Sequence, residues 1–120
     1  MSLAGLTILA LEDEPVIGLA LEDLLIDAGA DCRIAATLRS AEALLAEGKA
    51  DAALLDVNIS GTTSYGFAAS LRQAGVPFVF CTGYGGAIHP PEYADVPTVA
   101  KPYSQADLEA AFARLGVGGE

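Results

Sequence analysis

The sequence predicts an α/β fold, a doubly wound sheet of five parallel strands in a single domain that spans residues 1–120. Five short apolar runs recur along the chain, and each ends in polar or glycine-rich turn residues, as buried strands of parallel sheets do. Stretches with apolar residues at helical spacing separate most of these runs. Because parallel strands need right-handed crossover connections, this alternation favours helices on both faces of one sheet.

The first strand is expected between Leu6 and Leu11, and it ends on the acidic stretch Glu12-Asp13-Glu14. Pro15 follows, and proline suits the first position of a helix because its missing N–H costs no hydrogen bond there. The spacing then predicts a helix that ends at Gly29 and buries Ile17, Leu21, Leu24 and Ala28.

A second strand is expected from Cys32 to Ala36, followed by a helix from Ser40 to Glu47. The third strand is a continuous apolar run that ends on one carboxylate, Asp56, and a loop from Asn58 to Ser64 follows it. The next helix is predicted to bury Phe67, Ala68, Leu71 and Ala74 and to end at Gly75.

The fourth strand is expected from Val76 to Cys81. Glycines and prolines interrupt every apolar period between Gly83 and Pro97, so a helix in this segment is expected to be short or mobile. A last short strand from Pro97 to Ala100 leads into a final helix, for which Ser104 and Asp107 form a capping box. Its expected buried face is Leu108, Ala111, Phe112 and Leu115.

The charge, the apolar runs and the cysteine spacing of the chain indicate which kinds of partner and location to expect. The formal net charge is -10, from 16 acidic and 6 basic residues, which opposes binding to nucleic acid, because that needs clustered Lys and Arg. No stretch approaches the roughly 20 apolar residues of a membrane span. Cys32 and Cys81 lie in apolar stretches without CxxC spacing, so we expect buried thiols in a cytoplasmic protein.

Polar residues that follow four of the strands are the predicted functional site, because the carboxyl ends of parallel strands meet at one edge of a sheet. Three carboxylates on such an edge repel one another, so they must either take up protons or share a cation, and oxygen ligands of this kind suit Mg²⁺. The predicted set is Glu12, Asp13, Asp56, Thr82 and Lys101. Metal and lysine together can hold the oxygens of a phosphoryl group, and an ionised Asp56 is a competent nucleophile toward phosphorus.

With these residues the chain resembles the response-regulator receiver domains of bacterial two-component phosphorelay signalling over essentially its whole length. The resemblance implies a (βα)5 flavodoxin-like fold with strand order 2-1-3-4-5. It implies Mg²⁺ binding by Glu12, Asp13, Asp56 and the backbone carbonyl of Asn58, and phosphorylation of Asp56 by a histidine kinase. Thr82 and Lys101, which precedes Pro102, match the phosphoryl-binding and switch positions.

The stretch Phe80-Cys81-Thr82-Gly83-Tyr84 resembles the Phe-Ala-Thr-Gly-Tyr signature of the FAT GUY subgroup. Regulators of that subgroup are often single domains and resemble partners of HWE-type histidine kinases. Gly83, Tyr84, Pro102 and Tyr103 are therefore expected to support the site.

Two positions depart from the broader family. Ile59-Ser60 replaces the Met-Pro that commonly follows the phosphoacceptor, and Thr98 stands at the usual aromatic switch position. His89, the only histidine, is expected to be an exposed loop residue without a catalytic role. Because Thr98 is not aromatic, the sequence leaves open whether Thr82 acts through an aromatic side chain in this chain.

The same fold also serves other functional classes. A flavin or dinucleotide binder needs a phosphate-cradling loop where this chain has Glu12-Asp13-Glu14. A hydrolase with an aspartyl nucleophile needs a second acid at the position of Asn58, so the domain is expected to be no enzyme, with slow self-dephosphorylation at most. The alternative that stays open is a pseudo-receiver, which binds partners without phosphorylation. The preferred hypothesis is a switch in which phosphorylation of Asp56 reorders the segment from Gly83 to Tyr93, the place of the family's fourth helix, and so alters binding of a downstream protein.

Overall fold

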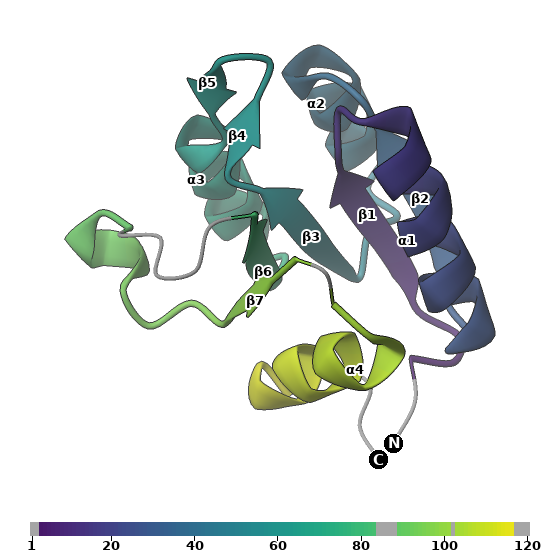
Figure 1. Cartoon of the computed structure of the whole chain (residues 1–120). Coiled ribbons are helices and arrows are strands. Elements are labelled where there is room, and N and C mark those ends of the chain that lie inside the picture. Colours follow the sequence, from purple (N-terminus) through teal and green to yellow (C-terminus); the bar gives the residue numbers. More distant parts are fainter. Residues whose placement is uncertain (1–2, 84–88, 102, 117–120) are drawn as a thin grey trace.

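The computed structural model describes residues 3–83, 89–101 and 103–116, and it is shown in Figure 1. In chain order the elements are β1 (Thr7–Leu11), α1 (Pro15–Asp27), β2 (Asp31–Ala35), α2 (Leu38–Ala46), β3 (Ala52–Asp56), β4 (Asn58–Ile59), β5 (Thr62–Thr63), α3 (Tyr65–Ala74), β6 (Phe78–Thr82), the 3₁₀ helix η1 (Pro91–Tyr93), β7 (Thr98–Ala100) and α4 (Gln105–Arg114).

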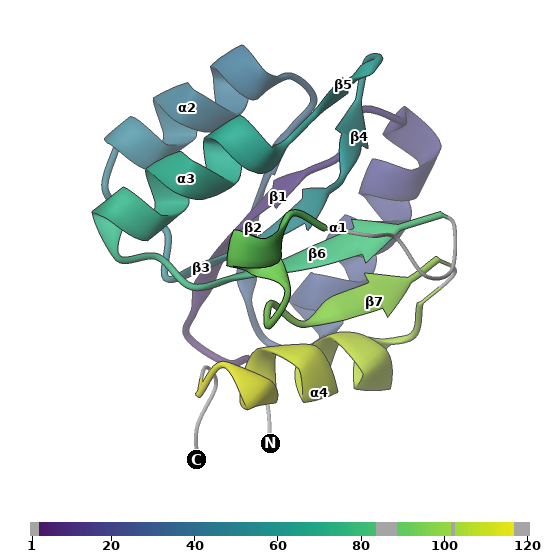
Figure 2. The same ribbon diagram turned by 90° about the vertical axis from the view of Figure 1, so that its left-hand side faces the viewer.

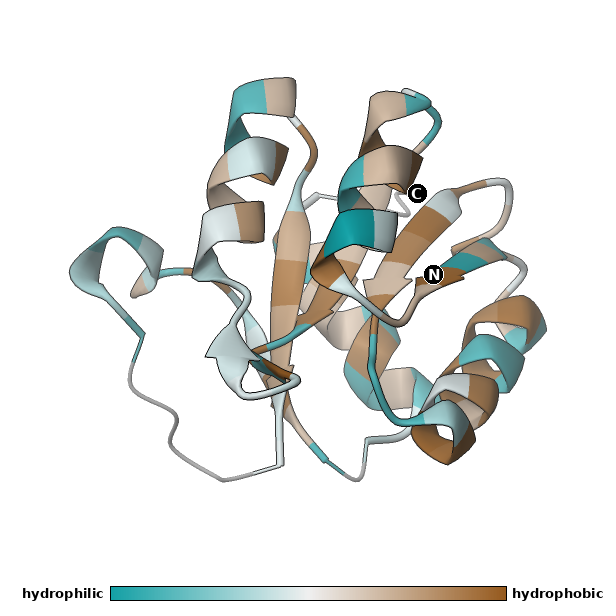
Figure 3. Ribbon diagram, turned by 90° about the horizontal axis from the view of Figure 1, so that it is seen from above, coloured by the Kyte–Doolittle hydropathy of each residue, from teal (hydrophilic) through white to brown (hydrophobic). Residues whose placement is uncertain are grey.

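The main sheet has five parallel strands in the order β2-β1-β3-β6-β7. Counted along the chain among these five, that is the order 2-1-3-4-5, and it confirms the predicted topology. Helices cover both faces: α1 and α4 pack on one, and α2 and α3 lie side by side on the other (Figure 2). The strands at the centre of Figure 3 are largely hydrophobic, as a sheet covered on both faces requires.

The core is divided into two clusters by the alternation of side chains along each strand. On β3, Leu54 joins the cluster under α1 and α4, where it shares the interior with Phe112. Its neighbour Leu55 points to the other cluster, under α2 and α3, with Phe67. Every residue of β3 is buried because β1 and β6 flank it. The strand that ends on Asp56 is therefore enclosed on both faces and both edges.

The buried faces of the helices differ from the predicted ones at single positions, and Leu115 after α4 is half-buried against the core. Helix α1 buries Gly18, Leu21 and Leu25, whereas Ile17 and Leu24 are only half-buried. Its C-cap Ala28 is buried as predicted. Ala74, expected to point inward, is exposed at the end of α3. The capping box predicted for Ser104 and Asp107 is confirmed, and Thr37 and Ser40 form another at the start of α2.

The segment from Asn58 to Ser64, predicted as a loop, contains a small hairpin. Strands β4 and β5 pair antiparallel, with Asn58 opposite Thr63 and Ile59 opposite Thr62. Ile59 is buried, so it anchors the base of the hairpin to the core. The hairpin rises beside the carboxyl end of β3 (Figure 1).

Between β6 and β7 the described residues form a single turn of 3₁₀ helix, η1, and no α-helix. This agrees with the interrupted apolar pattern of the sequence. Residues 84–88 lie outside the described part of the chain, as does residue 102, so the predictions for Tyr84 and Pro102 fall outside it. None of the helices in the described part is long and apolar enough to cross a membrane.

Candidate phosphoryl and metal site

The register of the sheet brings the predicted residues to one edge. Leu11 pairs with Leu55, Asp56 pairs with Cys81, and Thr82 pairs with Ala100. Glu12, Asp56 and Lys101 directly follow Leu11, Leu55 and Ala100, so they lie at the same edge of the sheet. A backbone hydrogen bond from the Lys101 N–H to the Thr82 carbonyl, 2.8 Å long, continues the pairing beyond the last ladder position. The sheet therefore fixes the spacing of these side chains before any ligand arrives.

Lys101 bridges two carboxylates from different strands. Its Nζ donates to Glu12 Oε1 at 2.9 Å and to Asp56 Oδ2 at 3.0 Å. The exposed fractions of the side chains are 15% for Lys101, 0% for Glu12 and 11% for Asp56, so the three charges interact with little screening by water. Glu12 Oε2 also accepts the backbone N–H of Glu14 at 3.2 Å.

Burial and hydrogen bonding shift the pKa values of Glu12 and Lys101 in opposite directions. Burial raises the pKa of Glu12, and the hydrogen bond from Lys101 offsets only part of that rise. For Lys101 burial lowers the pKa, but the hydrogen bonds to Glu12 and Asp56 outweigh it and raise the pKa above its ordinary value. The ammonium is thus charged at any physiological pH and works as a fixed cation beside Asp56.

The third carboxylate, Asp13, is held by the β4–β5 hairpin instead of by a cation. Its Oδ2 accepts the backbone N–H of Ser60 at 2.8 Å. One oxygen each from Glu12, Asp13 and Asp56 lie within 4.8 Å of one another. Three convergent carboxylate oxygens beside a hollow with room for water are a donor set that fits Mg²⁺, which keeps several waters when it binds to protein.

The hollow at this edge measures about 500 Å³. Ten residues line it, from the ends of strands, the turns that follow them and the first turn of α1: Asp13, Glu14, Ile17, Asp56, Asn58, Ser60, Gly61, Thr82, Gly83 and Lys101. The structure thus brings together Asp56, Asn58, Thr82 and Lys101, as predicted, and Gly83 also lies on the wall. Tyr103 does not line the hollow but packs against the core cluster that contains Phe112, and its buried hydroxyl has no hydrogen-bond partner in the described part of the chain.

A family model for the response regulator receiver domain matches residues 8–113. The chain belongs to the response regulator receiver domain family. No curated protein sequence matches it.

Solved structures agree with this assignment. SdrG from Sphingomonas melonis Fr1 is 36% identical, with a TM-score of 0.80, and the match covers 98% of this chain and all (100%) of that one. A structure of the BeF3-activated conformation of SdrG is 34% identical over 95% of this chain and 98% of that one, with a TM-score of 0.76. TrrA from Thermotoga maritima, solved in complex with Mg(2+)-BeF, shares the fold at 23% identity and a TM-score of 0.79 over 96% of this chain and 99% of that one.

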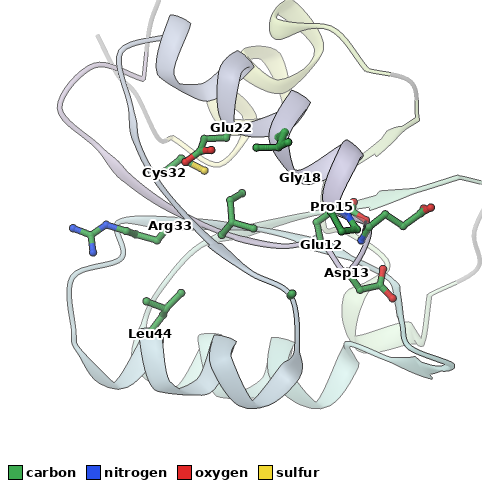
Figure 4. Close-up of a pocket in the computed structure, with 12 residues that line it drawn as sticks. Glu12, Asp13, Pro15, Gly18, Glu22, Cys32, Arg33 and Leu44 are labelled. Carbon is green, nitrogen blue, oxygen red and sulfur yellow. Dashed lines mark hydrogen bonds between the residues drawn. The ribbon is translucent and has the colours of Figure 1, made fainter.

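This receiver domain has a second hollow, of about 540 Å³, between α1 and α2 over the edge strand β2. Asp13 lies at one end of it and Cys32 at the other (Figure 4). Burial raises the pKa of the Cys32 thiol to about 12, so this group is no nucleophile at neutral pH. Burial does the same for Cys81, and both cysteines are free and buried, as the sequence predicted.

The contacts of Ser60 and His89 leave no signal in the local sequence. Ser60 was placed only in a loop, and its contact with Asp13 leaves no local signal because the donor is a backbone amide. His89 was expected to be exposed and without a role, but it is half-buried. Its Nδ1 lies 2.8 Å from the Tyr65 hydroxyl, its Nε2 lies 2.8 Å from Thr98 Oγ1, and its ring packs on Phe80 at a centroid distance of 4.5 Å.

Proposed function

We propose that this receiver domain is a phosphoryl-accepting signalling switch and that Asp56 accepts the phosphoryl group. Receiver domains in general are signalling modules that accept phosphate rather than enzymes. The observation that carries the proposal for this chain is the bridge from Lys101 to Glu12 and Asp56 in a water-accessible hollow. Outside such a site, a buried cluster of two carboxylates and one ammonium has no evident benefit for stability.

The proposed reaction is an in-line transfer from a phosphohistidine of a histidine kinase. A carboxylate oxygen of Asp56 attacks phosphorus, the bond between phosphorus and the imidazole nitrogen breaks, and an acyl phosphate remains on Asp56. Lys101 would stabilise the negative charge that this transfer spreads over the phosphoryl oxygens. Its position within 3.0 Å of the acceptor carboxylate supports this role.

The domain is proposed to use Mg²⁺, which receiver domains usually bind at an acidic site. Glu12, Asp13, Asp56 and the backbone carbonyl of Asn58 would hold it. The metal would supply positive charge to the transferred phosphoryl group. The likeness to TrrA, which was solved with Mg(2+)-BeF, supports the assignment through the shared fold.

The switch itself is proposed to run through Thr82. This side chain is buried, with 5% of its surface exposed, and it lies on the wall of the hollow, one residue after Cys81, which pairs with Asp56 in the sheet. New phosphoryl oxygens on Asp56 would attract its hydroxyl and move the segment from Gly83 to Tyr93, which would alter the surface offered to a downstream protein.

An exposed apolar face of α1 is the proposed docking surface for the kinase, which the FAT GUY signature predicts to be of the HWE type. Val16, Leu19 and Ile26 expose 79%, 64% and 54% of their surface, and α1 begins directly after the acidic loop of the site. Glu22 and Asp23 flank this face, so it fits a helix that carries an apolar stripe with Lys or Arg beside it. Leu19→Glu should slow transfer from a purified kinase that phosphorylates the wild type and leave the reaction with acetyl phosphate unchanged. Equal slowing of both reactions would contradict this surface.

The acceptor is tested by incubating the protein with acetyl phosphate, with and without Mg²⁺, and measuring intact mass. We expect a metal-dependent gain of one phosphoryl group in the wild type and in Asp23→Asn, an exposed aspartate of α1, and no gain in Asp56→Asn. A gain in Asp56→Asn would overturn the acceptor assignment. No gain in any protein would favour the pseudo-receiver, which binds partners without phosphorylation.

A further inference from the structure

The tip of the β4–β5 hairpin has an unusual backbone. Its two turn residues, Ser60 and Gly61, both have positive φ, 50° and 85°, as the type I′ turn of a two-residue hairpin requires. Ser60 is the one non-glycine residue with positive φ among residues 3–83, 89–101 and 103–116. A side chain in this conformation is strained, and such strain persists only where the surroundings hold it.

Asp13, on the other side of the hollow, holds Ser60 in this conformation. Its backbone N–H donates to Asp13 Oδ2 at 2.8 Å, and its hydroxyl lies 3.5 Å from the same oxygen. The two residues are 47 positions apart, so this contact joins the hairpin after β3 to the acidic loop after β1. A charged acceptor makes this hydrogen bond stronger than one between neutral groups.

The three carboxylates of the site are held in different ways. Glu12 and Asp56 are both fixed by the ammonium of Lys101. Asp13 receives the amide of Ser60 instead, a donor that brings no net charge. Its negative charge therefore stays available to a metal, while its rotation is restricted.

We propose that Ser60 is a positioning residue for the metal site: its backbone N–H holds Asp13 toward Glu12 and Asp56, so that the cation meets a carboxylate already in place. This inference rests on the proposed function of the site. It makes the β4–β5 hairpin part of the metal site, although no side chain of the hairpin is required as a ligand. A proline at this position has no N–H and cannot adopt a φ of 50°, so Ile59-Ser60 permits a contact that the more common Met-Pro does not.

The contact is tested by comparing Ser60→Pro with Ser60→Gly. The glycine variant keeps the N–H and favours positive φ, whereas proline removes both. We expect Ser60→Pro to weaken Mg²⁺ binding about tenfold in calorimetric titrations, since the loss of an orienting partner of a ligand has this effect. Ser60→Gly should bind Mg²⁺ like the wild type. Equal affinity of wild type and Ser60→Pro would overturn the proposal.

A second readout separates positioning from a loss of structure. With acetyl phosphate, Ser60→Pro should need more Mg²⁺ for half-maximal phosphorylation but reach the wild-type rate at saturating Mg²⁺. A rate that stays low at saturation would contradict a role through Asp13 alone. If Ser60→Pro fails to fold, Ser60→Val takes its place, because a β-branched residue keeps the N–H but resists positive φ.

A third measurement needs no change at position 60. In metal-free protein the Ser60 amide should exchange its hydrogen slowly, and Asp13→Ala should accelerate that exchange while leaving the amides of β3 protected. Unchanged exchange at Ser60 would contradict the contact. A wild type that binds no Mg²⁺ would instead contradict the proposed function, so the two failures are distinguishable.

Discussion

Lys101 Nζ lies 3.0 Å from Asp56 Oδ2, so the proposed acceptor is already paired with a cation before any metal or phosphoryl group arrives. The same ammonium holds Glu12, whose side chain is fully buried. In the metal-free protein one positive charge thus balances part of the negative charge of two carboxylates. Addition of Mg²⁺ would bring a second cation to the same group of oxygens.

Lys101→Met is expected to destabilise the metal-free protein by about 2 kcal/mol, because it leaves Glu12 and Asp56 without their counter-charge. Mg²⁺ should restore most of this loss, since it supplies the missing positive charge. Urea unfolding with and without Mg²⁺ measures both effects. Lys49→Met, at an exposed lysine, is the matched control and should change little. Equal effects of the two substitutions would show that the bridge does not stabilise the site.

Mg²⁺ is expected to stabilise the wild type against unfolding. At a concentration ten times the dissociation constant, the free energy of unfolding should rise by about 1.4 kcal/mol. Asp13→Asn removes one carboxylate of the set, so the same addition should stabilise it much less. Thermal unfolding over a series of Mg²⁺ concentrations gives the comparison. Stabilisation of Asp13→Asn equal to that of the wild type would place the metal elsewhere.

His89 is expected to make stability depend on pH below about 6.5. Burial lowers its pKa in the folded protein, so the unfolded state binds a proton first as the pH falls, and the free energy of unfolding decreases from pH 6.5 down to the folded pKa. The His89 ring lies between two hydroxyl groups: Nδ1 is 2.8 Å from the Tyr65 hydroxyl and Nε2 is 2.8 Å from Thr98 Oγ1. A protonated ring donates from both nitrogens, so both hydroxyl oxygens must then accept.

His89→Asn should remove this pH dependence, because no other histidine is present. The raised pKa of Glu12 acts in the opposite direction: the folded state binds a proton first, so its contribution to stability increases as the pH falls toward 4.5. Urea unfolding of both proteins between pH 7 and pH 5 separates the two groups. A slope that persists unchanged in His89→Asn would contradict the role of the histidine.

Two glycines of α3 should respond oppositely to alanine. Gly75, the C-cap, has a φ of 75°, so Gly75→Ala should destabilise by about 1 kcal/mol although no atom would lie near the added Cβ. Gly66 lies within the helix with equal free space, and Gly66→Ala should stabilise by about 0.5 kcal/mol. Chemical unfolding of the two variants gives the signs, and the same sign for both would contradict the backbone explanation.

The sheet and most of its site could be predicted because their signals are local in the sequence. Buried parallel strands are continuous apolar runs, and Glu12, Asp56 and Thr82 stand directly at or after the ends of such runs. The face of α1 was harder, since Val16, Leu19 and Ile26 are apolar and yet exposed. With apolar residues around most of the helix, periodicity alone does not decide which side is buried.

The contacts of Ser60 and His89 could not be predicted for a different reason. Every residue except proline has the amide that Ser60 uses, so only the position of the hairpin selects it. His89 forms hydrogen bonds with Tyr65 of α3 and Thr98 of β7, which lie 24 and 9 residues away in the sequence. Nothing in the local pattern of a glycine- and proline-rich segment indicates those partners.

The bridge between Lys101 and Glu12 spans 89 positions of the chain, and this separation has a consequence for synthesis of the protein. On the ribosome, β1 and β3 emerge with their carboxylates well before β7 delivers the lysine. A nascent chain that ends before β7 contains the proposed acceptor Asp56 but lacks the Lys101 ammonium that pairs with it. The charge pairing of the site is therefore completed only when β7 joins the sheet.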